Sequence, residues 1–82
     1  MAEIIMYGLT TCPHCKRAHK LLSKIGVDFD VVWIDQLGGE ERKKAIERVH
    51  SISGSYSVPL IVRGDRYVLG FNREKILELV QG

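Results

Sequence analysis

The chain has 82 residues, enough for a single domain over 1–82 and too few for a second hydrophobic core. Hydrophobic residues make up 45% and charged residues 27%, the composition of an ordinary globular protein. The net charge is only +2 with basic and acidic residues interspersed, so we expect no nucleic-acid or membrane partner. No apolar run approaches the roughly 18 residues of a membrane helix, and acidic Glu3 stands where a signal peptide is basic. We therefore expect a cytoplasmic protein.

The first half of the chain predicts a strand, a helix and a second strand. Residues 4–7 form a continuous apolar run that ends at Gly8, as in a buried strand. A helix is expected from Pro13, which suits a first turn, to the stop signal Gly26. Residues 29–34 are rich in β-branched and aromatic side chains and predict a strand. Apolar residues recur at helical spacing in the helix: Ala18, Leu21, Leu22 and Ile25.

The second half begins with a break at Gly38-Gly39, followed by a second helix. Acidic Glu40 and Glu41 suit the positive N-terminal end of that helix. Its expected inner face consists of Ala45, Ile46, Val49 and Ile52. Residues 53–57 are turn-like.

Two strands and a helix complete the predicted chain. Residues 60–62 and 67–69 predict a hairpin with a tight turn over 63–66. The last helix is expected from about 72 to 80, with one apolar side made of Ile76, Leu77 and Val80. The order β-α-β-α-β-β-α predicts an α/β fold with a four-stranded mixed sheet flanked by three helices. A right-handed crossover makes the first two strands parallel, and the hairpin is antiparallel.

The motif Thr11-Cys12-Pro13-His14-Cys15 lies between the first strand and the first helix. Two cysteines with this spacing inside a βαβ unit are typical of a redox-active dithiol. Unpaired N–H groups at the helix start stabilise a thiolate at Cys12, while Cys15 lies one turn further in. We predict that Cys12 attacks a substrate disulfide and that Cys15 resolves the mixed disulfide. A structural bridge is less favoured, because a four-residue ring stabilises by only about 2 kcal/mol.

The chain as a whole resembles a glutaredoxin-like redoxin. The resemblance is carried by Tyr7-Gly8, by the cysteine motif, by Ser57-Val58-Pro59 and by Gly70-Phe71. It implies a thioredoxin-like, glutaredoxin-sized fold, thiol–disulfide oxidoreductase activity and a cis peptide bond before Pro59. It also implies that the backbone of Val58 pairs with an extended substrate segment. The implied substrate-binding residues are Thr11, Val58, Pro59, Gly70 and Phe71.

Pro13 and His14 are expected to tune the dithiol. An imidazole beside Cys12 adds to the stabilisation by the helix and favours the reduced protein. We therefore expect a disulfide more oxidising than that of a typical thioredoxin, whose potential is about −270 mV. The alternative is that His14 is a neutral spacer.

Two positions depart from the glutathione-using members of the family. Those proteins usually carry a lysine three residues before the first cysteine, where this chain has Leu9. They also carry an aspartate in the loop that here reads Leu69–Arg73. The chain looks more like redoxins recharged by a thioredoxin reductase, which reduce ribonucleotide reductase or other disulfide enzymes. We expect a monomeric electron carrier of that kind, with no bound cofactor besides the Cys12–Cys15 disulfide. The alternatives are glutathione coupling and a metal or iron–sulfur carrier.

The remaining histidines and aromatic residues carry weaker signals. Cys12, Cys15 and His19 supply at most three of the four ligands of a closed zinc site, so no metal site is expected. His19 and His50 are expected on solvent-facing helix surfaces. Trp33 is expected to pack on the core or at the sheet edge. Tyr56 is expected to pack on the core, and the alternative is that it lines the substrate groove.

Two basic residues follow the motif directly. Lys16 and Arg17 either steer substrates toward Cys12 or form a solvated helix face.

Overall fold

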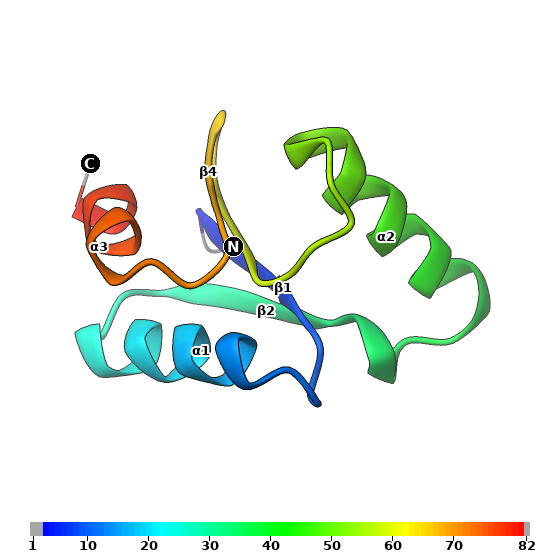
Figure 1. Cartoon of the computed structure of the whole chain (residues 1–82), viewed down its shortest axis with the longest axis horizontal. Coiled ribbons are helices and arrows are strands. Elements are labelled where there is room, and N and C mark those ends of the chain that lie inside the picture. The colour runs from blue at the N-terminus through cyan, green and yellow to red at the C-terminus, as the bar shows by residue number, and fades with distance from the viewer. Residues whose placement is uncertain (1–2, 82) are drawn as a thin grey trace.

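The computed structural model describes residues 3–81, whose elements follow the predicted order (Figure 1). The elements are β1 (Ile4–Gly8), α1 (Pro13–Ile25), β2 (Phe29–Trp33), the 3₁₀ helix η1 (Ile34–Gln36), α2 (Gly39–Ser53), β3 (Leu60–Arg63), β4 (Arg66–Leu69) and α3 (Arg73–Gln81). Within residues 3–81, each helix is too short or too polar to span a lipid bilayer.

The four described strands form one mixed sheet in the order β2-β1-β3-β4. β1 runs parallel to β2 and antiparallel to β3, and β3 and β4 form the antiparallel hairpin. The register aligns Val31, Met6, Ile61 and Val68 in one row across the sheet. The sheet therefore confirms the thioredoxin-like α/β fold predicted from the sequence.

The helices form a layer on each face of the sheet, with α1 and α3 on one face and α2 on the other (Figure 1). Met6 and Ile61 face α1 and α3, while Tyr7 and Leu60, one residue along each strand, face α2. This alternation follows from the two-residue period of a strand. Burying each large aliphatic side chain stabilises the fold by about 2 kcal/mol.

The faces of two helices and the end of one strand differ from the prediction. Ile46, expected inside, is 37% exposed, because the inner stripe of α2 is centred on Ala45 and Val49. In α3 the fully inward residues are Ile76 and Leu79, while Leu77 is half-buried. A helix turns by about 100° per residue, so only residues three or four apart share the buried line. Ile34, expected in the second strand, begins η1.

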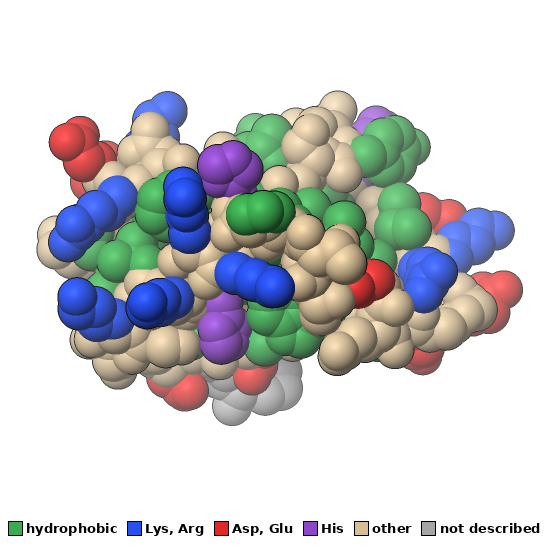
Figure 2. All heavy atoms as spheres, turned by 60° about the horizontal axis from the view of Figure 1, so that its bottom comes forward, with side chains coloured by type: hydrophobic (Ala, Val, Ile, Leu, Met, Phe, Trp, Pro, Cys, Tyr) green, Lys and Arg blue, Asp and Glu red, His purple; other side chains and the backbone are tan. Residues whose placement is uncertain are grey.

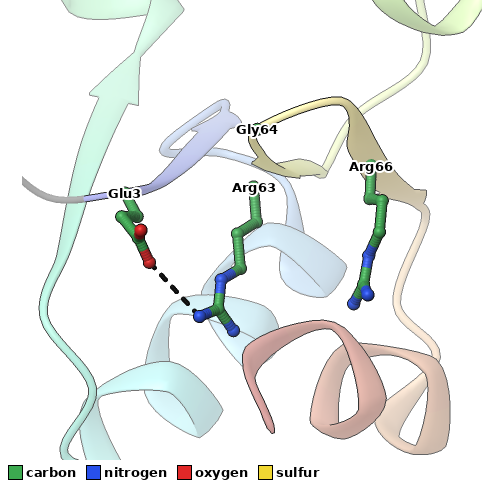
Figure 3. A pocket seen from close by; sticks show the side chains of 4 residues that line it. All are labelled: Glu3, Arg63, Gly64 and Arg66. Carbon is green, nitrogen blue, oxygen red and sulfur yellow. Dashed lines mark hydrogen bonds and ion pairs between the residues drawn. The ribbon is translucent and has the colours of Figure 1, made fainter. Parts of the chain in front are cut away.

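Two arginines of the β3–β4 hairpin hold the C-terminal end of α3 (Figure 3). Arg63 Nη1 donates to the carbonyl oxygens of Leu79 and Val80 at 3.0 and 2.8 Å, and Arg66 Nη2 donates to Leu79 O at 3.3 Å. The guanidinium groups satisfy unpaired carbonyls at the negative end of the helix. Arg63 also pairs with the exposed Glu3 at 3.2 Å, which adds little stability.

Candidate active site

Cys12 is the N-cap residue of α1, so its sulfur lies at the positive end of the helix. The backbone of Cys12 is extended, and the N–H of Cys15 donates to Cys12 Sγ at 3.3 Å. Pro13 follows at the first helical position, where no N–H is needed. The sulfur thus takes the place of the usual capping oxygen, and both the N–H group and the helix dipole stabilise negative charge there.

Cys15 is fully buried between α1 and the sheet. Burial raises the pKa of the Cys15 thiol to about 12, and its hydrogen bond with Cys12 adds to the effect. Cys15 is therefore protonated at neutral pH, whereas the half-buried Cys12 is accessible from solvent. The two cysteines, both free thiols here, have different environments although they lie one helical turn apart.

A contact between Thr10 and Asp35 fixes the loop before the motif. The N–H of Thr10 donates to Asp35 Oδ1 at 3.0 Å, and the Thr10 hydroxyl donates to Asp35 Oδ2. Both hydrogen bonds lower the pKa of Asp35, and the bond from the Thr10 hydroxyl has the larger effect. Arg42 of α2 donates to the carbonyl oxygens of Asp35 and Leu37, both at 3.0 Å. The motif is thereby attached to η1 and α2.

A second loop carries the predicted cis peptide bond, which joins Val58 and Pro59. Pro59 is fully buried, and its carbonyl oxygen accepts a hydrogen bond from Gly70 N at 2.8 Å. Gly70 has a φ of +84°, which favours glycine. This bond brings the Val58-Pro59 segment together with Gly70-Phe71, although ten residues separate them in the chain.

The predicted site residues converge unequally. Cys12, Val58 and Phe71 are half-buried and pack against one core cluster, to which Cys15 belongs. Thr11, Pro13 and His14 are exposed around the start of α1. Thr10 and Asp35 were not predicted to belong to the site, because nothing in the local pattern links residues 25 positions apart.

His19 was expected to face solvent, but it is half-buried and contacts two aromatic rings. Its ring centroid lies 5.5 Å from those of Phe29 and Trp33, both of which belong to β2. Trp33 packs on the core, as predicted. Within residues 3–81, no three His, Cys, Asp or Glu side chains lie close enough together to hold a metal ion.

Tyr56 is 67% exposed, so the expectation that it packs on the core is wrong. The turn after α2 carries it outward, and its ring stacks on exposed His50 with centroids 4.5 Å apart.

The fold and the site together define a dithiol redox protein with the thioredoxin fold. The Glutaredoxin family profile matches residues 4–68. Over 78 residues the chain is 35% identical to a glutaredoxin of Pseudomonas aeruginosa, with 95% of this chain and 87% of that protein covered. The chain belongs to the glutaredoxin family, whose members act as thiol–disulfide oxidoreductases.

Solved structures agree with this assignment. The structure is similar to that of glutaredoxin grx-1 from Archaeoglobus fulgidus, with a TM-score of 0.97 and 67% identity over 100% of this chain and 89% of that one. It is also similar to methanoredoxin from Methanosarcina acetivorans, with a TM-score of 0.89 and 42% identity, covering 93% of this chain and 81% of that one.

Proposed function

We propose that this protein is a cytoplasmic, monomeric electron carrier that reduces disulfide bonds in other proteins through Cys12 and Cys15. The observation that carries the proposal is the asymmetry of the pair. The half-buried sulfur of Cys12 accepts a hydrogen bond at the helix start, while Cys15 is fully buried and protonated. An accessible attacking thiolate and a protected resolving thiol are the two parts that the exchange reaction requires.

The reaction runs in two exchanges. The Cys12 thiolate attacks one sulfur of the client disulfide, and the other client sulfur leaves as a thiolate that takes up a proton. Cys15 then loses its proton and attacks Cys12 Sγ, and the second client sulfur leaves and is protonated. The client gains two electrons and two protons, and the Cys12–Cys15 disulfide is formed. The raised pKa of Cys15 keeps it from competing with Cys12 for the first attack.

The client segment lies against the two loops joined at Pro59 and Gly70. The resemblance assigns substrate contacts to Thr11, Val58, Pro59, Gly70 and Phe71. Support comes from the packing of Val58 and Phe71 against the same cluster as Cys12. Among residues 3–81, no backbone hydrogen bond of the loops engages Val58, which leaves its N–H and C=O for an extended client strand. Pro13 and His14 retain their proposed role in tuning the potential.

A thioredoxin reductase is the proposed electron donor, and ribonucleotide reductase is a candidate client. Support comes from the two missing charges, since Leu9 replaces a lysine and the loop 69–73 has no aspartate. Glutathione is the second candidate donor, which membership of the glutaredoxin family favours.

The test compares two donors with one protein disulfide substrate, insulin. One assay supplies NADPH and thioredoxin reductase, and the other supplies NADPH, glutathione and glutathione reductase. We expect turnover in the first assay at least about tenfold faster, which is 1.4 kcal/mol in barrier height. Efficient turnover by glutathione alone defeats the choice of donor. Activity in Cys12→Ser defeats the assigned nucleophile, whereas Cys15→Ser is expected to accumulate the mixed disulfide.

A further inference from the structure

Helix α1 carries charge of one sign only. Its 13 residues include four exposed basic side chains and no acidic one; the basic residues are Lys16, Arg17, Lys20 and Lys24. Lys20 lies four residues from both Lys16 and Lys24, and such like-charged neighbours destabilise a helix.

Helix α2 does not share this clustering of like charges. Its Glu40 is followed by Lys44 four residues later, and its Lys43 by Glu47, so opposite charges are neighbours. Figure 2, in which the lower side of Figure 1 comes forward, shows the contrast. Lys and Arg side chains gather on the left with hydrophobic atoms between them and acidic side chains toward the edges, while basic and acidic side chains alternate on the right. The excess of basic side chains is therefore a local feature of α1.

Three of the four basic residues of α1, all except Lys16, border a groove of about 270 Å³ against the loop that precedes α3. Six residues line this basic groove, and none of them is acidic: Arg17, Lys20, Leu21, Lys24, Phe71 and Arg73. The four from α1 have the spacing i, i+3, i+4 and i+7, which places them in one stripe along the helix. Leu21 and Phe71 are half-buried and form an apolar floor between the cations.

The basic groove runs along α1 away from the dithiol. With a rise of 1.5 Å per residue, Arg17 lies about 7.5 Å and Lys24 about 18 Å along the helix from Cys12. An extended polypeptide covers about 3.3 Å per residue. Its side chains at about two to six residues from a cysteine bound to Cys12 would therefore face the groove.

We propose that the basic groove binds an acidic segment of the protein partner, about two to six residues from the partner's reacting cysteine. The recognised chemistry is two or more carboxylates flanking an apolar side chain. The carboxylates match Arg17, Lys20, Lys24 and Arg73, and the apolar side chain covers Leu21 and Phe71. A nucleic acid would meet the charges but leave the apolar floor uncovered. The inference rests on the proposed function, because the segment is presented only while Cys12 exchanges with the partner.

The test uses synthetic peptides with one cysteine, activated as the mixed disulfide with thionitrobenzoate, whose release reports the attack by Cys12. Each peptide carries an arm of about six residues on one side of the cysteine, and both sides are tried. The arm is acidic with a central leucine, neutral with glutamines, or basic with lysines. Second-order rates are measured at low and high salt.

We expect the acidic arm to react about tenfold faster than the neutral arm at low salt, and this ratio to fall below about twofold at high salt. The double variant Lys20→Glu/Lys24→Glu is expected to reverse the preference in favour of the basic arm. The control Lys43→Glu/Lys44→Glu changes the net charge equally, but on α2, and keeps the acidic preference. Equal rates for the three arms, or an equal loss of the acidic preference in both variants, overturn the proposal that the groove binds an acidic segment. No reaction with any peptide overturns the proposed function as well.

Discussion

Gly8 and Cys15 approach so closely that a β-carbon on Gly8 would lie 3.1 Å from both Cβ and Sγ of Cys15. The same β-carbon would lie 3.1 Å from Cε of Met6. The end of β1 and the first turn of α1 are therefore packed so tightly that a side chain at position 8 requires its neighbours to shift by a few tenths of an ångström. The side chain of the resolving cysteine therefore packs directly against the end of β1.

Gly8→Ala is expected to destabilise the reduced protein by about 1–3 kcal/mol, the usual cost of overpacking a core. The displaced Cys15 should also slow the resolution of a mixed disulfide. Urea unfolding and rapid-quench trapping of the intermediate measure the two effects. Gly38→Ser is the control, since a β-carbon there meets nothing within 4 Å and serine suits an N-cap. Unchanged stability and kinetics in Gly8→Ala would contradict the importance of this contact.

The different environments of the two thiols predict selective alkylation. Iodoacetamide at neutral pH should modify Cys12 once and leave Cys15 free, because Cys15 is fully buried and its pKa is raised to about 12. Mass spectrometry of peptides locates the adduct. Denaturant should expose both cysteines to the reagent. The folded Cys12→Ser variant should remain unmodified. Rapid labelling of Cys15 in that variant would contradict the claim that burial protects Cys15.

The pKa of Cys15 also predicts alkaline sensitivity. An unfolded thiol titrates near pH 9.0, and burial raises the pKa in the folded protein to about 12. Between these values the folded state binds the extra proton, so the free energy of unfolding falls as pH rises above about 9. The loss is at most about 1.4 kcal/mol per pH unit. Urea titrations of the reduced protein should show it, and Cys15→Ala should lack this component while Cys12→Ser retains it.

The lowered pKa of Asp35 makes the stability of the protein fall as the pH decreases in the acid range. Its bonds from Thr10 lower the pKa below the ordinary value of 3.8. The unfolded state therefore takes up the proton first, and stability present above about pH 4 is lost as the pH falls through the folded value. Asp35→Asn and Thr10→Val should both flatten the acid limb of stability in urea titrations and slow attack by Cys12. Asp30→Asn, at an exposed position of β2, is the control. An acid limb that is equal in all four proteins would rule out the contact as its source.

The sequence predicted what depends on local periodicity. The bounds of α1 follow from Pro13, the apolar stripe and Gly26, whose N–H donates to Leu22 O in a left-handed cap. The cis bond before Pro59 came from the resemblance, since local sequence favours trans.

Contacts between distant segments were not predictable in this way. The Thr10–Asp35 bonds depend on where the end of β2 meets the loop after β1. The position of His19 depends on where α1 lies relative to β2, whose Phe29 it contacts. The sequence alone does not show this, because a helical histidine suits a solvent-facing surface as well as a partly buried one.

His19 offers a matched comparison with His50, since both are helical histidines that contact aromatic rings. His19 meets Phe29 and Trp33 while half-buried, whereas exposed His50 stacks on a tyrosine that is itself 67% exposed. Replacement by alanine improves helix propensity equally at both positions. The difference between the two changes in stability therefore reports the ring contacts. His19→Ala should destabilise by about 1 kcal/mol more than His50→Ala, because buried aromatic contacts contribute about 0.5–1.5 kcal/mol. The fluorescence of Trp33 should shift to longer wavelength only in His19→Ala, since water then reaches the indole. Equal stabilities and an unshifted spectrum would place His19 on the solvent-facing surface after all.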